Sequence, residues 1–139
     1  MPSSVVCVDA SFILRLLIGG PGEEKAAEVW KEWEGTQIIA PGLIFYEIGN
    51  ALHRLVLHGT LSPKGAEEFM NTALNLGIKT YHEDWLFPTA MQLARKLKLP
   101  ALYYAYYLAL AQATNTELWT ADLKLYKKAR KAVPLIKTL

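Results

Sequence analysis

Short apolar runs alternate with longer amphipathic stretches along the chain, and this alternation predicts strands separated by helices. The short runs predict strands at residues 5–8, 38–40, 78–81, 117–120 and 135–137. Strands that alternate with helices are typical of helices packed on both faces of a mostly parallel sheet. We therefore expect a three-layer α/β/α sandwich with a mostly parallel central sheet.

The longer stretches carry apolar residues at helical spacing, with glycine or proline between several of them. They predict helices over residues 12–18, 23–34, 41–58, 63–75, 85–97, 102–113 and 123–132. Ser62 is expected to cap one helix and Asp84 another, while Pro41 is expected to begin a third. Because neither a linker nor a repeat interrupts this order, we expect residues 1–139 to form a single domain.

Composition narrows the class of protein without identifying it. A hydrophobic fraction of 52% with 20% charged residues predicts a folded chain with its own core. A net charge of +2 barely argues for nucleic-acid binding, so any basic patch must be local. Cys7 is the single cysteine, which excludes an intrachain disulfide, and we expect it to be buried in a strand.

The first apolar stretch is interrupted by Asp9 and Arg15. We therefore expect neither a signal peptide nor a membrane span, and we expect a cytoplasmic protein.

Three acidic residues stand at positions where acids seldom occur by chance. Asp9 follows the first predicted strand, Asp122 follows the fourth, and Glu47 borders the apolar face of the helix after the second. Ligands of a parallel sheet gather at the carboxyl ends of its strands, so these side chains are expected to converge. Carboxylate oxygens are the ligands of hard divalent cations, and the pattern indicates a metal site.

Each acid also has a purely structural interpretation. Asp9 and Asp122 are suited to cap the helices that follow them, and Glu47 suits the first turn of a helix. Other strand-end chemistries are disfavoured, because Ser11 stands where an aspartyl-nucleophile phosphatase has a second aspartate. The turn after the first strand also lacks the glycines of a nucleotide-binding loop. The histidines show no metal-binding spacing.

With these residues placed, the chain resembles the PIN domain family, and within it the VapC-like toxins of toxin–antitoxin pairs. The matching segments occur in the family's order, at residues 6–11, 39–41, 46–52, 103–111 and 118–122. The resemblance implies an endoribonuclease that depends on Mg²⁺ or Mn²⁺ and leaves 5′-phosphate and 3′-hydroxyl ends. It also implies RNA as the substrate, an antitoxin protein as a partner and a homodimer.

The resemblance assigns roles to individual residues. The acids that match the family's catalytic and metal-binding positions are Asp9, Glu47 and Asp122. The matching supporting polar residues are Ser11, Asn50 and Thr120.

One position departs from the family, which has a further aspartate where this chain has Tyr104. A tyrosine is neutral at pH 7 because its ordinary pKa is about 10. Two functions therefore stay open. One is a ribonuclease that holds its metal more weakly, and the other is a catalytically silent PIN domain that binds RNA or protein.

Basic and aromatic residues near the site have alternative interpretations as well. The basic helix near the C-terminus offers either phosphate contacts or a solvated face through Lys124, Lys127, Lys128 and Lys131. The tyrosines at 103, 104, 106 and 107 either stack on bases or pack in the core. Trp30 and Trp33 either pack in the core or line a groove for an antitoxin helix.

Overall fold

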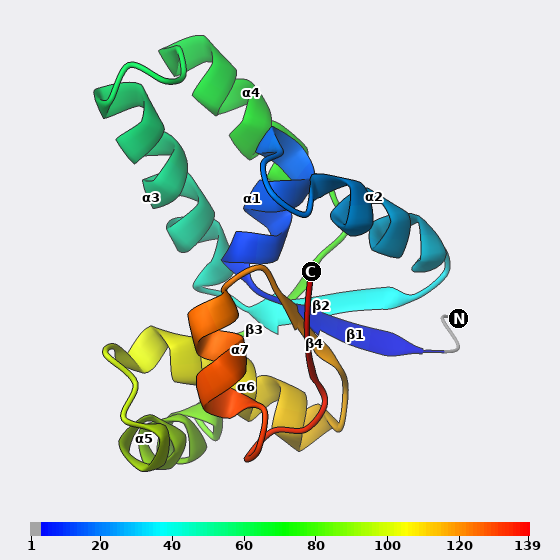
Figure 1. Ribbon diagram of the computed structural model, residues 1–139, viewed down its shortest axis with the longest axis vertical. Coiled ribbons are helices and arrows are strands. Elements are labelled where there is room, and N and C mark those ends of the chain that lie inside the picture. The colour runs from blue at the N-terminus through cyan, green and yellow to red at the C-terminus, as the bar shows by residue number, and fades with distance from the viewer. Residues whose placement is uncertain (1–3) are drawn as a thin grey trace.

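A computed structural model describes residues 4–139, which form seven helices and a five-stranded sheet (Figure 1). Every strand pair is parallel, in the order β3-β2-β1-β4-β5. The strands are β1 (Val5–Val8), β2 (Gln37–Pro41), β3 (Lys79–Tyr81), β4 (Leu118–Thr120) and β5 (Ile136–Thr138). The expected α/β/α sandwich is confirmed, while residues 1–3 of the expected single domain lie outside the described part.

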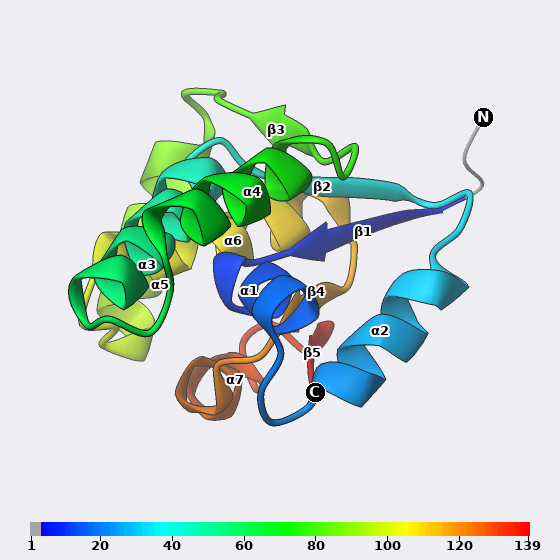
Figure 2. The ribbon, with the colours of Figure 1, turned by 90° about the horizontal axis from the view of Figure 1, so that it is seen from above.

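The helices cover both faces of the sheet (Figures 1 and 2). They are α1 (Ala10–Ile18), α2 (Glu23–Glu32), α3 (Ile44–Leu57), α4 (Pro63–Leu74), α5 (Leu86–Leu97), α6 (Leu102–Thr114) and α7 (Leu123–Ala129). Helices α1 to α4 lie on one face, and α5 to α7 lie on the other. None of the helices described for residues 4–139 has the length and apolar character needed to cross a lipid bilayer.

The core lies between these layers and begins with the central strand β1. Its residues Cys7 and Val8 are fully buried, as are Ile39 and Ala40 of the neighbouring β2. A strand with helices on both faces must be apolar on both sides, which is why these runs do not alternate with polar residues. The expectation that Cys7 is buried in a strand is confirmed, and burial raises the pKa of its thiol well above the ordinary value.

The start of α3 differs from the sequence prediction. Pro41 does not begin a helix but is the last residue of β2, where it pairs with Tyr81. The N–H of the following residue, Gly42, donates to the carbonyl of Tyr81 at 2.9 Å. A proline is compatible with this position because the next residue supplies the donor that continues the ladder.

Two further predictions about helix ends are wrong. Asp84 does not cap α5 with its side chain, because the N-cap position is Trp85 and the N–H of Phe87 bonds to the backbone carbonyl of Asp84. Helix α7 ends at Ala129 and not at residue 132. The chain turns there because Val133 must enter the core ahead of β5. By contrast, Ser62 caps α4 as predicted by accepting the N–H of Gly65.

Candidate functional site

Strands β1 and β4 are neighbours at the centre of the sheet, and the strand order reverses between them. From β1 the chain continues to β2 and β3 on one side, and from β4 it continues to β5 on the other side. A parallel sheet opens a crevice for ligands at the carboxyl ends of such a strand pair. Asp9 directly follows β1, Asp122 follows β4 by two residues, and Glu47 lies in the first turn of α3. The topology therefore brings all three acids to one edge of the sheet.

Asp9 is a buried carboxylate that is only 5% exposed. Its Oδ1 accepts the hydroxyl of Ser11 at 2.6 Å and the N–H of Phe12 at 3.0 Å, while Oδ2 accepts the hydroxyl of Thr120. Burial is the largest influence and raises the pKa of Asp9, and the charge of Asp122 raises it further. The hydrogen bonds from these hydroxyls and from the Phe12 N–H lower it. Asp9 therefore caps α1 and also provides a buried carboxylate at the site.

The two hydroxyls join the end of β1 to the segment that follows β4. Ser11 Oγ accepts the N–H of Ala121 at 2.9 Å, and Thr120 Oγ1 accepts the N–H of Asp122 at 2.9 Å. Because both hydroxyls also donate to Asp9, they fix the backbone of Asp122 relative to the Asp9 carboxylate. This arrangement suits the supporting role expected for Ser11 and Thr120.

Asp122 caps α7, since its Oδ1 accepts the N–H of Leu125 at 3.1 Å. The structural interpretations of Asp9 and Asp122 as helix caps are thus confirmed. A cap uses one carboxylate oxygen and leaves lone pairs for another ligand, so capping and metal binding are compatible.

Glu47 is half-buried and receives the hydroxyl of Tyr107 on Oε1 at 2.6 Å. Burial raises the pKa of Glu47, the Tyr107 hydrogen bond lowers it, and the charge of Asp9 raises it. Tyr107 is 2% exposed, and burial together with Glu47 holds its pKa above the ordinary range. Tyr107 orients Glu47, a role that the sequence did not reveal. The available signal was its position three residues after Tyr104, on the same side of a helix.

A cavity of about 610 Å³ lies over this edge, and we call it the acid cavity. Its polar lining comes from Ser11, Tyr46, Glu47, Asn50, Arg54, Tyr103, Tyr104 and Asp122. Asp9 is adjacent to the lining residues Ala10 and Ser11, beneath the surface. The acid cavity thus brings together residues from α1, α3, α6 and the start of α7.

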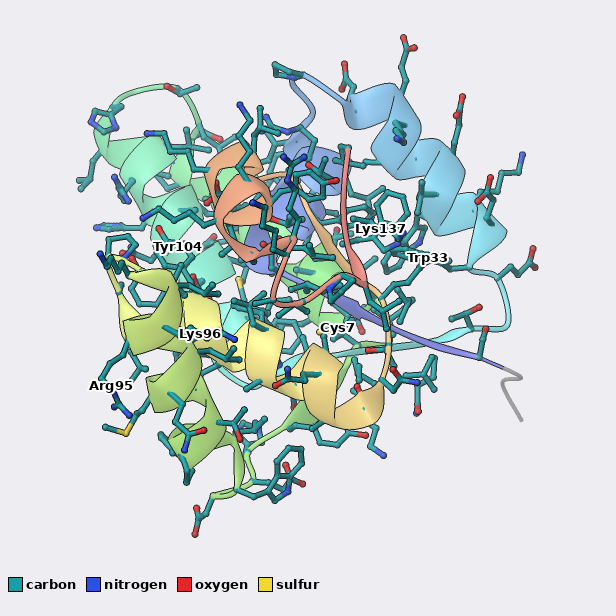
Figure 3. All side chains as sticks on the ribbon, turned by 60° about the horizontal axis from the view of Figure 1, so that its bottom comes forward. Cys7, Trp33, Arg95, Lys96, Tyr104 and Lys137 are labelled. Atoms are coloured by element: carbon teal, nitrogen blue, oxygen red, sulfur yellow. The ribbon has the colours of Figure 1, made fainter. Side chains whose placement is uncertain are left out.

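Tyr104 lies near the start of α6 (Figure 3), and it lines the acid cavity. The hydroxyl of Tyr103, partial burial and then the charges of Asp122 and Glu47 raise the pKa of Tyr104. The phenol is therefore neutral and close to two of the three acids. The structure places a tyrosine, with no charge to offer a cation, in the position where the resemblance implies an aspartate.

The three acids surround one site but do not meet at a point. Among residues 4–139, no three His, Cys, Asp or Glu side chains lie close enough together to hold a metal ion. Their mutual influence is pairwise, with Asp122 and Glu47 each coupled to Asp9. The donor chemistry fits a hard divalent cation, which takes carboxylate oxygens and completes its shell with water.

The four lysines of the basic helix differ in whether they line a cavity. Lys124 and Lys128 line a smaller cavity of about 130 Å³ together with Tyr104 and Asp122. Lys127 and Lys131 are exposed and lie outside the lining of that cavity.

The tyrosines of α6 divide between the core and the cavity. Tyr107 is buried, and the ring of Tyr106 packs against Phe87 with 5.3 Å between centroids. Tyr103 is 43% exposed and its ring lies 4.7 Å from that of Tyr104, so this pair at the acid cavity could stack on a base.

Trp30 in α2 and Trp33 at its C-cap are partly buried and pack against the core. The ring of Trp33 lies 5.2 Å from Phe12 and 5.9 Å from Trp119, and 6.0 Å from Trp30. The core interpretation of Trp33 is confirmed by these contacts with a fully buried phenylalanine. Figure 3 shows Trp33 between α2 and the sheet.

Comparisons with known proteins agree with this arrangement. A sequence profile described as "PIN domain" matches residues 6–131. The chain is 29% identical over 133 residues to a VapC ribonuclease of Mycobacterium bovis, covering 94% of this chain and 96% of the relative. It has the same identity and coverage with ribonuclease VapC9 of Mycobacterium tuberculosis.

Solved structures share the fold. PAE2754 from Pyrobaculum aerophilum superposes with a TM-score of 0.68 at 25% identity, over 89% of this chain and 86% of that one. VapBC2 from Rickettsia felis, bound to a promoter DNA fragment, superposes with a TM-score of 0.71 at 10% identity, over 96% of this chain and 98% of that one. A toxin–antitoxin complex from Klebsiella pneumoniae superposes with a TM-score of 0.61 at 22% identity, over 96% of each chain. At such low identity the last two show the fold alone.

Proposed function

The chain belongs to the PIN domain family, with VapC ribonucleases among its relatives, and we propose that it hydrolyses RNA phosphodiester bonds with Mg²⁺ or Mn²⁺. The proposal rests on one observation above all. Glu47 and Asp122 line one cavity at the switch point of the sheet, and the buried Asp9 lies next to its lining residues Ala10 and Ser11.

The acids and the neighbouring hydroxyls have different roles in the proposed site. Asp9, Glu47 and Asp122 would hold the cation, which when bound acidifies water and offsets charge on the scissile phosphate. Ser11 and Thr120 keep Asp9 in place through hydrogen bonds to its two oxygens.

Two further groups complete the proposed site. Tyr107 donates to Oε1 of Glu47 and so fixes which oxygen faces the cavity. Asn50 lines the same cavity three residues after Glu47, where its amide is suited to donate to a phosphate oxygen.

A second function, binding RNA or protein without cleavage, is favoured by a specific observation. Tyr104 lines the cavity beside Glu47 and Asp122, and no three acids of residues 4–139 are grouped for a metal. A neutral phenol removes one negative charge from the expected ligand set. The ribonuclease is the better supported of the two, because the VapC relatives of this chain are ribonucleases along nearly its full length.

The proposed partners follow from the family. We propose an antitoxin protein, since one of the similar folds is described as a toxin–antitoxin complex and another as VapBC2. A homodimer, a cytoplasmic location and a single domain over the whole chain complete the proposal.

A cleavage assay tests the ribonuclease. Purified protein with Mn²⁺ and a structured RNA should produce cleavage that EDTA stops, and Asp9→Asn or Asp122→Asn should reduce the rate at least about 100-fold. Glu117→Gln is the matched control, because Glu117 is an exposed acid that bonds to Trp119 instead of facing the cavity. Cleavage by Asp9→Asn at the rate of wild type would contradict the proposed site. RNA binding without any cleavage by wild type would support the second function.

A further inference from the structure

A second cavity, of about 480 Å³, lies between α1 and α3 beside the acid cavity. We call it the basic cavity. Its lining comprises Ser11, Leu14, Arg15, Ile18, Gly19, Ala51, Arg54, Leu55 and His58. Four of these residues, Ser11, Leu14, Ala51 and Arg54, line both cavities. The two cavities are therefore neighbours with opposite charge, and the proposed catalytic site does not use the cationic one.

Arg15 carries an unsatisfied polar atom at the basic cavity. Its Nε is buried and has no hydrogen-bond partner within residues 4–139. A buried donor without an acceptor is unfavourable by roughly 1–3 kcal/mol in general, so such groups are rare unless a ligand completes them. Because Arg15 lines the cavity, its guanidinium is a group that an incoming acceptor would meet there.

The backbone beside Arg15 is shaped to admit this side chain. Gly20 has a φ of +109°, and a Cβ there would lie only 2.5 Å from Nη1 of Arg15. A glycine therefore lets the guanidinium lie directly against the chain. The carboxylate of Glu23 approaches the neighbouring Gly19, but two arginines outweigh one acid at this cavity.

The second wall adds nitrogen donors at helical spacing. Arg54 and His58 are four residues apart on α3, so they lie on one side of the helix, and both line the basic cavity. Both side chains are exposed and can reach a bound group. Guanidinium groups form forked hydrogen bonds with phosphate oxygens, which makes a phosphate the chemical class that this lining fits.

We propose that the basic cavity binds a backbone phosphate of the RNA, adjacent to the phosphate that is cleaved over the acid cavity. The RNA as the source of this phosphate rests on the proposed function. Arg15 and Arg54 bind the phosphate. Ser11, which lines both cavities, lies between the basic cavity and the acid cavity. The chain thereby orients the RNA before any cation takes part.

RNA binding without divalent ions tests this subsite separately from cleavage. The full-length protein is titrated into a fluorescent single-stranded RNA in EDTA at several salt concentrations, and anisotropy gives the dissociation constant. Arg54→Gln and Arg15→Gln should each weaken binding roughly tenfold, and Arg54→Lys should weaken it less. Loss of one neutralised phosphate should also reduce the slope of log K against log salt by about 0.7.

Arg95→Gln is the matched control, because it removes the same charge from an exposed helix position on the outer side of α5 (Figure 3). It should leave both the affinity and the slope unchanged. Since Arg54 is exposed, its variants test the proposal even where Arg15→Gln fails to fold. Unchanged affinity and slope in folded Arg54→Gln would overturn the proposal.

Titration with inorganic phosphate separates the two sources of the anion. If inorganic phosphate competes with RNA in wild type but not in Arg54→Gln, one shared phosphate site is supported. Binding of free phosphate through Arg54, with RNA affinity independent of Arg54, would overturn the RNA assignment. If wild type binds RNA through these arginines yet cleaves nothing, the subsite stands and the proposed ribonuclease fails.

Discussion

Asp9 shows how a single residue combines structural and chemical demands. It caps α1, receives two hydroxyls and yet remains a buried acid whose pKa is raised chiefly by burial. Burial makes the charged form of such an acid less stable in the folded protein than in the unfolded chain. The position therefore favours function at the expense of stability.

The pH dependence of stability follows from the raised pKa of Asp9. Its folded pKa lies above the unfolded value of about 3.9, so stability falls as pH rises through the interval between the two. Asp9→Asn carries no such charge and should be more stable than wild type at pH 7 without metal. Thermal unfolding followed from pH 7 towards pH 4 should show the advantage of the variant shrinking. A difference independent of pH would contradict an elevated pKa.

Tyr107 is the residue that sequence patterns did not reveal, because it acts on Glu47 across 60 positions of the chain. Tyr107→Phe removes one hydrogen bond to a carboxylate and should lower the unfolding free energy by about 1–2 kcal/mol. It should also weaken Mn²⁺ binding, since Glu47 loses its orienting partner. Tyr106→Phe is the control, because Tyr106 packs against Phe87 outside the acid cavity. Equal Mn²⁺ affinity in wild type and Tyr107→Phe would refute the orienting role.

Tyr104 is where the chain departs from its family, and its effect can be measured. Tyr104→Asp adds a carboxylate to a cavity that already holds Glu47 and Asp122, so it should tighten Mn²⁺ binding and raise the cleavage rate. Tyr104→Phe removes only the hydroxyl and should do neither. An unchanged Mn²⁺ titration for Tyr104→Asp would show that the missing acid does not limit the site.

Among the elements, the sequence predicted the interiors of helices and strands better than their ends. Strand β1 was predicted with its observed bounds because four apolar residues are followed by a polar cap. Pro41 was misplaced because a proline suits both the first turn of a helix and the last residue of a strand, and the pairing with Tyr81 decides between them. Pairing across the sheet is not visible in local sequence.

Helix α7 leads to a prediction about which lysines contact RNA. Lys124 and Lys128 line a cavity with Tyr104 and Asp122, whereas Lys127 and Lys131 do not. Replacing Lys124 and Lys128 together by alanine should lower cleavage and make it less sensitive to salt, by about 0.7 in slope for each phosphate contact. The double alanine variant of Lys127 and Lys131 removes the same charge and is the control. Equal effects of the two double variants would indicate a general charge effect without a defined contact.

At the scale of the whole molecule, the strand order determines which residues meet. The alternation of strands and helices was sufficient to predict the layered fold, and the positions of Asp9 and Asp122 were sufficient to predict a shared edge. The separation of the acids was not predictable, because it depends on side-chain partners such as Tyr107 and Thr120. The basic cavity was also not predictable, since Arg15 and Arg54 line one cavity only when α1 packs on α3.

Calorimetric titration of Mn²⁺ into the protein tests directly whether the three acids act on one cation. Binding should be measurable in wild type and in the control Glu117→Gln, and it should weaken at least about tenfold in each of Asp9→Asn, Glu47→Gln and Asp122→Asn. Similar losses from three elements would show that all three acids contribute to the same metal site. Wild-type affinity in all three variants would contradict a shared metal site, and with it the proposed ribonuclease.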